Sequence, residues 1–72
     1  MERQPVHSSS LKAVGYDPAA RTLEIEFHDG DVYQYFNVPP VVYRDLLLAE
    51  SAGRYFAFFI KTTYRCRKVA RG

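Results

Sequence analysis

Residues 21–36 contain the pattern that most restricts the fold of this chain. Between positions 21 and 28, hydrophobic side chains alternate with polar ones, which is the period of a strand with one buried face. The dipeptide Asp29-Gly30 follows, and residues 32–36 are rich in the aromatic side chains that favour strands. The sequence therefore predicts an antiparallel hairpin with one hydrophobic face.

The length of the hairpin loop decides where the two tyrosines of the second strand point. A two-residue loop would place an amide side chain in the middle of the hydrophobic face. A three-residue loop with a left-handed Gly30 avoids this conflict. The opposing pairs are then Tyr33 with Ile25 and Tyr35 with Leu23. We therefore expect both tyrosines in the core, the alternative being a platform on which bases stack.

One more strand and two helices are predicted around this hairpin. Residues 11–16 are compatible with a strand and end at a proline turn. A helix is expected to begin at Pro39-Pro40, where a missing N–H costs nothing, and to run to about residue 50. Ser51 can cap a second helix over residues 52–64, which leaves Phe58 off its buried stripe. That stripe comprises Tyr55, Phe56, Phe59 and Ile60.

These elements predict an α+β domain, a three-stranded antiparallel β-meander followed by two helices packed on one face of the sheet. A chain of 72 residues is short enough for one hydrophobic core only. We expect residues 1–9 to form a loose leader, residues 10–64 the single domain, and residues 65–72 a basic C-terminal tail.

The compartment is suggested by what the chain lacks. With a single cysteine it has no intramolecular disulfide, so a reducing cytoplasm is the expected location. No hydrophobic run approaches the ~18 residues of a membrane span, and the first ten residues lack the hydrophobic segment of an export signal. We therefore expect no membrane partner.

Few residues of the chain could carry out catalysis. Cys66 lies beyond the last predicted helix with no partner to orient it, so an incidental thiol is favoured over a nucleophile. Neither histidine has a metal-ligand spacing with it. Glu24 and Glu26 share a strand face, as a general acid and base would, but alternating glutamates are typical of a solvated strand face. The sequence predicts no catalytic site, metal, cofactor or small-molecule substrate.

A series of short motifs runs in a fixed order along most of the chain. It comprises Ser8-Ser9, Val14-Gly15-Tyr16-Asp17, Gly30, Tyr33-Gln34-Tyr35, Asn37-Val38-Pro39, Ser51-Ala52-Gly53-Arg54-Tyr55-Phe56, Ile60-Lys61 and Tyr64. This series resembles the KTSC domain, which occurs at the C-terminus of some lysyl-tRNA synthetases and as small bacterial proteins. Two departures from the family pattern are Phe58-Phe59, where polar residues are usual, and Arg54, where lysine is frequent.

The resemblance implies structural roles for several motif residues, while the family itself has no assigned function. RNA binding is suggested only by the fusion to synthetases. The residues given structural roles are Ser9, Gly15, Tyr16, Gly30, Tyr33, Tyr35, Pro39, Ser51, Gly53, Tyr55 and Phe56.

Charge is distributed unevenly along the chain. Residues 1–43 carry three basic and six acidic side chains, whereas residues 44–72 carry seven basic and two acidic ones. The basic residues after position 60 are Lys61, Arg65, Arg67, Lys68 and Arg71. Such a segment can contact a phosphate backbone, although a solvated terminus that aids solubility has the same composition. The serines at positions 8–10 could also meet phosphate, but capping of local backbone is favoured.

Two functional hypotheses follow from these residues. The first is RNA binding by the basic C-terminal segment, with an exposed Phe36 stacking on a base. The alternative is a protein-interaction or self-association module that uses Phe58, unless this side chain packs under the leader. The partners predicted are therefore RNA, or a protein that could be a second copy of the chain.

Overall fold

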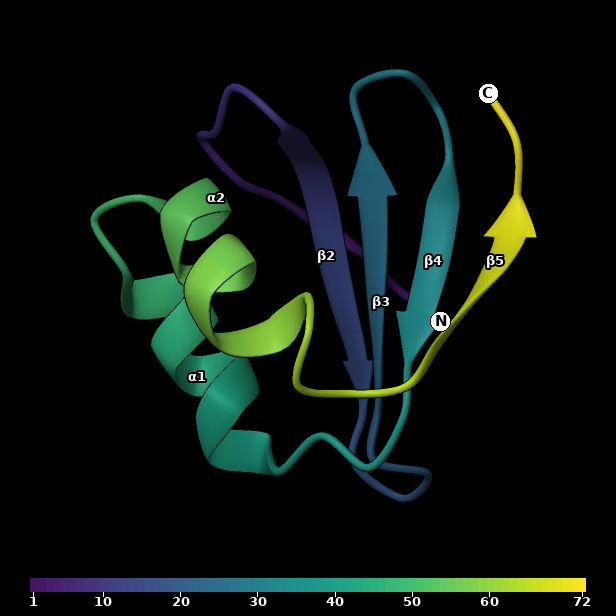
Figure 1. The fold of residues 1–72 in the computed structure, drawn as a ribbon, viewed down its shortest axis with the longest axis vertical. Coiled ribbons are helices and arrows are strands. Elements are labelled where there is room, and N and C mark those ends of the chain that lie inside the picture. The colour runs from purple at the N-terminus through teal and green to yellow at the C-terminus, as the bar shows by residue number, and fades with distance from the viewer.

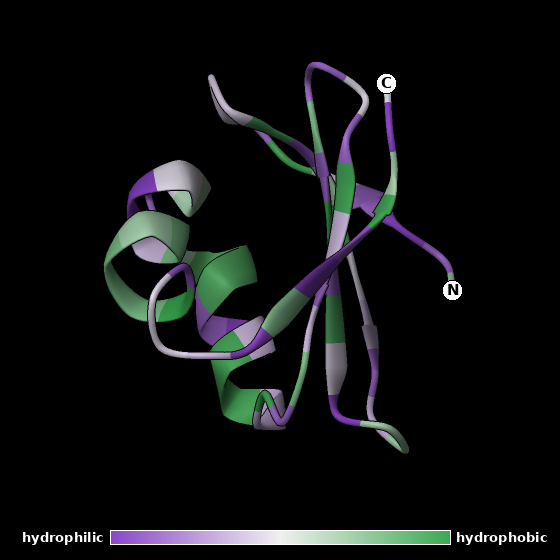
Figure 2. Cartoon of the chain, turned by 45° about the vertical axis from the view of Figure 1, so that its right-hand side comes forward, coloured by the Kyte–Doolittle hydropathy of each residue, from purple (hydrophilic) through white to green (hydrophobic).

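Five antiparallel strands form one sheet in chain order, and both helices lie on one of its faces (Figures 1 and 2). The computed structural model describes all 72 residues. The strands are β1 (Gln4–Pro5), β2 (Leu11–Asp17), β3 (Thr22–Phe27), β4 (Val32–Tyr35) and β5 (Cys66–Ala70). The helices are α1 (Pro40–Leu48) and α2 (Ala52–Tyr55), and α2 continues into a π-helical turn, η1 (Phe56–Ile60). The α+β class and the two helices were predicted correctly.

The prediction of three strands was wrong, because β1 and β5 extend the meander at both edges. Every residue of β5 is exposed, so no alternation of buried and exposed side chains marks it in the sequence. β1 contains only two residues, one of them a proline, which is tolerated at a sheet edge. Both added strands depend on pairing with a neighbour rather than on their own pattern.

The predicted register of the central hairpin is confirmed. Tyr33 lies opposite Ile25, and Tyr35 opposite Leu23. The N–H of Phe27 donates to the carbonyl of Asp31 at 2.9 Å, and Gly30 has a φ of 91°. The three-residue loop therefore directs the tyrosines to the helix-covered face. Tyr35 is 4% exposed, and Tyr33 is half-buried beside it.

The helices supply the other half of the core. Pro40 begins α1, as expected, and the Ser51 hydroxyl accepts a hydrogen bond from the N–H of Arg54 at 3.2 Å, which caps α2. The side chains that meet in the core come from β2, β3, β4, α1, α2, η1 and the segment before α1. They are Leu11, Val14, Leu23, Ile25, Tyr35, Val38, Leu46, Ala52, Phe56 and Ile60.

The second helix is shorter than predicted and ends in a wider turn. The N–H of Lys61 donates to the carbonyl of Phe56 at 2.9 Å, a bond from residue i+5 to residue i. Because a π turn holds more residues than an α turn, Phe56 and Ile60 both face the core while the three residues between them, 57–59, are exposed. Phe59 was predicted in the buried stripe, but it is 58% exposed.

Candidate nucleic-acid interface

β5 forms one edge of the sheet and carries part of the predicted basic segment. Its residues pair in antiparallel register with β4, so that Arg67 lies opposite Gln34 and Lys68 opposite Tyr33. Opposed residues share a face of the sheet. Arg67 is therefore on the outer face, which no helix covers, whereas Lys68 is on the helix-covered face (Figure 2).

A second arginine and an aromatic side chain join Arg67 on the outer face. The N–H of Phe36 donates to the carbonyl of Arg65 at 2.9 Å, which continues the pairing beyond β4 and β5. Residues two apart on a strand point the same way, so Arg65 lies on the face of Arg67, and Phe36 on the face of Gln34. We call Phe36, Arg65 and Arg67 the basic corner.

Lys68 and the C-terminus are tied to the hairpin loop. Lys68 Nζ lies 2.9 Å from Asp31 Oδ2 and 5.8 Å from the centre of the Tyr33 ring. The Asp31 side chain also accepts a hydrogen bond from the N–H of Gly72 at 3.1 Å. Lys68 and then this N–H hold the pKa of the Asp31 carboxyl below 3.8, and the Arg71 charge adds to the effect. Lys68 thus already has an anionic partner within the chain.

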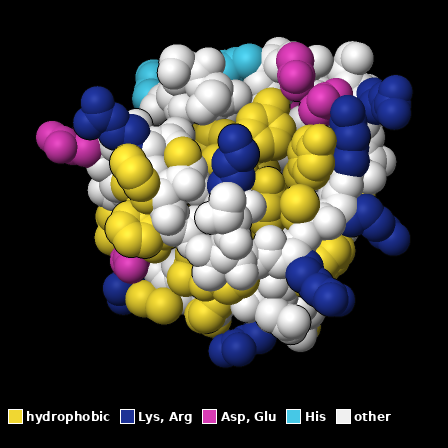
Figure 3. Space-filling view, viewed as in Figure 1, with side chains coloured by type: hydrophobic (Ala, Val, Ile, Leu, Met, Phe, Trp, Pro, Cys, Tyr) yellow, Lys and Arg dark blue, Asp and Glu magenta, His cyan; other side chains and the backbone are white.

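The other four predicted phosphate ligands have no ion-pair partner in the chain. They are Lys61, Arg65, Arg67 and Arg71. In Figure 3, Lys and Arg side chains line the right-hand side of the molecule, where Figure 1 places β5. Grouped cations on one edge create a positive potential that attracts polyanions.

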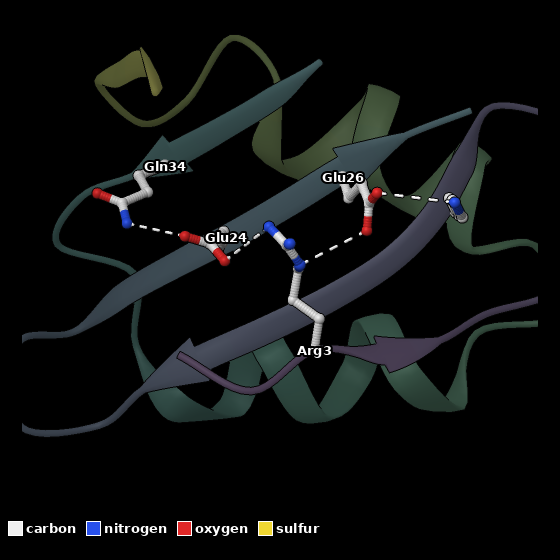
Figure 4. Close-up of polar contacts among 5 residues, drawn as sticks. Arg3, Glu24, Glu26 and Gln34 are labelled. Carbon is white, nitrogen blue, oxygen red and sulfur yellow. Dashed lines mark hydrogen bonds and ion pairs between the residues drawn. The ribbon is translucent and has the colours of Figure 1, made fainter. Parts of the chain in front are cut away.

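The carboxylates next to the basic corner are neutralised by the N-terminal segment (Figure 4). Arg3 Nη1 lies 3.0 Å from Glu24 Oε2, and its Nε lies 3.5 Å from Glu26 Oε1. Gln34 donates to the other Glu24 oxygen at 2.9 Å. Glu24 is only 8% exposed, so the expectation of a solvated glutamate face was wrong. Arg3 compensates the charges that would repel phosphates near Arg67.

Gly15 on β2 leaves room for Arg3 to cross the sheet. Gly15 lies opposite Glu24. A Cβ on Gly15 would come within 2.4 Å of the Glu2 carbonyl oxygen and 3.2 Å of Arg3 Cγ. The sequence analysis missed Arg3, because nothing local links a leader residue to a strand some twenty positions away. The glycine motif was the one available signal that another part of the chain passes close by.

The remaining aromatic candidates do not join the basic corner. Tyr35 is buried, and burial with the neighbouring Cys66 thiol raises the pKa of its hydroxyl. Tyr33 is held between Phe27, at 5.7 Å between ring centres, and Lys68. Phe58 is 75% exposed and belongs to η1, which follows α2 directly, and Figure 1 shows the helices to the left of the sheet and β5 at its right-hand edge. Phe36, which was predicted to be exposed, is half-buried, and it is the one aromatic candidate that lies beside Arg65 and Arg67.

The serine and glycine motifs have local structural contacts. Ser8 Oγ accepts from the N–H groups of Ser10 and Leu11 at 3.2 and 3.1 Å, which is the predicted backbone capping. A Cβ on Gly53 would lie 2.9 Å from the hydroxyl oxygens of both Ser8 and Ser10. Gly53 therefore lets the leader pack against the start of α2. Ser9 itself is exposed.

Three further motif residues stabilise the region around α1. The Tyr16 hydroxyl donates to the carbonyl of Val38, and its ring stacks on Tyr43 at 5.1 Å. Pro39, with φ of −64°, precedes the first residue of α1. These contacts attach the segment between the hairpin and α1 to strand β2.

The structure offers little that resembles reactive chemistry. No three side chains among His, Cys, Asp and Glu gather to hold a metal ion, and Cys66 is a free, exposed thiol on β5. No helix combines the length and hydrophobicity needed to cross a membrane. The fold and its surface thus define a small α+β domain with a basic sheet edge.

Comparison with known proteins assigns this domain to a family. The model of the KTSC domain matches residues 7–64, and the chain belongs to the KTSC domain family. The crystal structure of a KTSC domain protein from Yersinia pestis is similar to it, with a TM-score of 0.93 and 43% sequence identity, covering 96% of this chain and 97% of that one.

Two kinds of relative are similar to the chain in sequence. A protein of Tsukamurella paurometabola is 48% identical over 62 residues, which are 86% of this chain and 92% of that protein. A lysine–tRNA ligase of Nostoc sp. is 40% identical over 62 residues, which are 86% of this chain and 11% of the ligase. The domain thus occurs both in small proteins and as a minor part of a much larger enzyme.

Proposed function

We propose that this chain is a non-catalytic RNA-binding domain and that the basic corner is its main contact. The observation that carries the proposal is the placement of Arg65 and Arg67, without ion-pair partners, beside Phe36 on the outer face of the sheet, which no helix covers. Lys61, at the end of η1, and Arg71, directly after β5, are further exposed cations without ion-pair partners. The similarity to lysine–tRNA ligases supports RNA, and in particular tRNA, as the polyanion.

The mechanism is phosphate neutralisation with limited base stacking. Each arginine releases counterions from the RNA when it contacts a phosphate, and this gain does not depend on base sequence. Phe36 can stack on one base, a contact worth about 1–3 kcal/mol in single-strand binders. Because Arg67 is paired in β5 and the Arg65 carbonyl accepts from the Phe36 N–H, the backbone of both arginines is fixed before binding, and less entropy is lost than with a mobile tail.

The salt dependence of binding tests the proposal. If Lys61, Arg65, Arg67 and Arg71 neutralise four phosphates of a single strand, log affinity falls against log salt with a slope of about −3. Fluorescence anisotropy with labelled tRNA and with an unstructured RNA, at about 50 and 200 mM salt, measures this slope. Similar affinity for both RNAs is expected, since phosphate contacts carry no sequence information.

Matched arginine variants locate the contact. Replacing both Arg65 and Arg67 by alanine should make the slope shallower by about 1.4, which is the share of two contacts. Arg44→Ala is the control, because Arg44 is exposed on α1 and lies 3.1 Å from Asp45. Equal effects of the two changes, or no binding by the intact protein at low salt, would refute the assignment. Truncation before residue 66 is unsuitable, because it deletes the strand β5.

A further inference from the structure

The helical side of the molecule exposes a group of aromatic side chains that the RNA proposal does not use. Phe58 is 75% exposed and Phe59 is 58% exposed, and the Phe59 ring packs on Tyr55 at 4.8 Å. We call Tyr55, Phe58 and Phe59 the aromatic patch. These residues line a shallow hollow of about 420 Å³, together with Ala49, Glu50, Ser51 and Arg54. Leu48, directly before Ala49, is 75% exposed.

The π-helical turn produces the patch. In a regular α-helix, Phe59 would share the buried side with Phe56, which lies three positions before it. The i+5 bond from Lys61 to Phe56 widens the turn, so Phe59 rotates away from the core and joins Phe58 at the surface, while Ile60 stays buried. Such turns are rare and frequently accompany functional sites. The exposure of Phe59 next to Phe58 thus results from a defined backbone feature.

The charges beside the patch have opposite signs. Glu50 and Arg54 both line the hollow, and neither forms an ion pair within the chain. In Figure 3 the left-hand side of the molecule shows hydrophobic side chains with acidic and basic side chains next to them. A surface with one charge of each sign is complementary to itself when it is rotated about a two-fold axis. This arrangement favours a second copy of the chain over a partner of a single charge.

The exposed area is sufficient for the centre of a modest interface. At about 200 Å² for each phenylalanine side chain, the exposed parts of Phe58 and Phe59 amount to roughly 250 Å². A standard interface contributes roughly 800 Å² from each partner, with a hydrophobic centre inside a polar rim. The aromatic patch would supply that centre, and Glu50 and Arg54 would supply part of the rim.

We propose that two copies of this chain associate about a two-fold axis through their aromatic patches, with Glu50 of one copy facing Arg54 of the partner subunit. The proposal does not depend on RNA binding, since the patch shares no residue with the basic corner. In this dimer the two β5 edges stay free. Two linked basic corners would bind one RNA with increased avidity.

Sedimentation equilibrium measures the association directly. The intact protein should change from monomer to dimer between about 10 μM and about 1 mM. Phe58→Asp should raise the dimer dissociation constant at least about tenfold, because it buries a charge in the hydrophobic centre. Circular dichroism and the melting temperature should match the parent, since Phe58 is exposed. A monomer throughout this range, or dimerisation unaffected by Phe58→Asp, overturns the proposal.

Charge exchange tests the two-fold pairing without touching the patch. Glu50→Arg alone and Arg54→Glu alone should each weaken self-association, because like charges then face each other. An equal mixture of the two variants should associate about as well as the parent, since each restores the partner that the other needs. Failure of the mixture to recover rejects this two-fold arrangement, and its recovery also shows that both variants are folded.

Discussion

The two exposed regions of this small domain differ in what they present to a partner. The edge of the sheet at β5 presents charge, with Arg67 in the strand and Arg65 directly before it on the face that no helix covers. The π turn η1 presents hydrophobic area, with Phe58 and Phe59 turned away from the core. Lysine and arginine on an edge strand discourage pairing with other strands, so β5 suits polyanions rather than further sheet growth. The aromatic patch has the composition of a protein interface.

The two regions should respond differently to salt. Phosphate contacts weaken as salt rises, whereas association through hydrophobic area does not. The two regions nevertheless share support from the core. The Tyr35 ring packs edge-on against Phe56 at 5.4 Å, and Tyr35 lies opposite Cys66 of β5. One buried tyrosine therefore connects the edge strand with the π turn.

The largest effect is expected from Tyr35→Ala, which should damage both regions together. Truncation of a buried aromatic side chain typically costs about 3–5 kcal/mol of unfolding free energy, a large part of the stability of a small domain. Urea unfolding followed by circular dichroism measures the loss. Phe36→Ala is the control, because Phe36 is the next residue and its ring is only half-buried. It should lower the unfolding free energy less than Tyr35→Ala does. A Tyr35→Ala protein that unfolds like the parent would contradict the placement of this ring.

Gly30→Ala should disturb the basic edge more than the aromatic patch. Gly30 has a φ of 91°, where a side chain is strained by about 1–2 kcal/mol. A Cβ there would also lie 2.4 Å from the Cα of Gly72, so the C-terminal segment must move away from the hairpin loop. Amide hydrogen exchange should become faster in β5 and remain unchanged in η1. Equal acceleration in both segments would show that they open as one unit.

The smallest effect concerns the tie between Asp31 and Lys68, and it depends on pH. The pKa of Asp31 is lowered in the folded protein, so the tie stabilises the fold at neutral pH and is lost as the pH falls below 3.8. Asp31→Asn should remove this acid-dependent contribution and loosen β5 already at neutral pH. Thermal melts of both proteins between about pH 2 and 7 give the difference. An unchanged acid dependence would contradict a contribution from the tie between Asp31 and Lys68.

Part of the candidate site could be predicted from the sequence, and part could not. The basic residues were visible as composition, and their predicted roles remain predictions. Their arrangement was not visible, because an edge strand exposed on both faces leaves no hydrophobic alternation to read. Pairing with β4 decides that Arg65 and Arg67 share a face while Lys68 is turned toward Asp31. The ion pairs of Arg3 with Glu24 and Glu26 could not be read from the sequence either.

The sequence alone determined the central hairpin, because the register of a hairpin depends on residues that are close together in the chain. Loop length, the left-handed Gly30 and the two-residue alternation together admit one register that buries Tyr35 beside Leu23, and the structure has that register. The Ser51 cap was similarly local. Tertiary structure alone decided the burial of Glu24 under Arg3 and the π turn that exposes Phe59. Those outcomes depend on which distant surfaces meet, and a strand or helix does not encode its neighbours in its own periodicity.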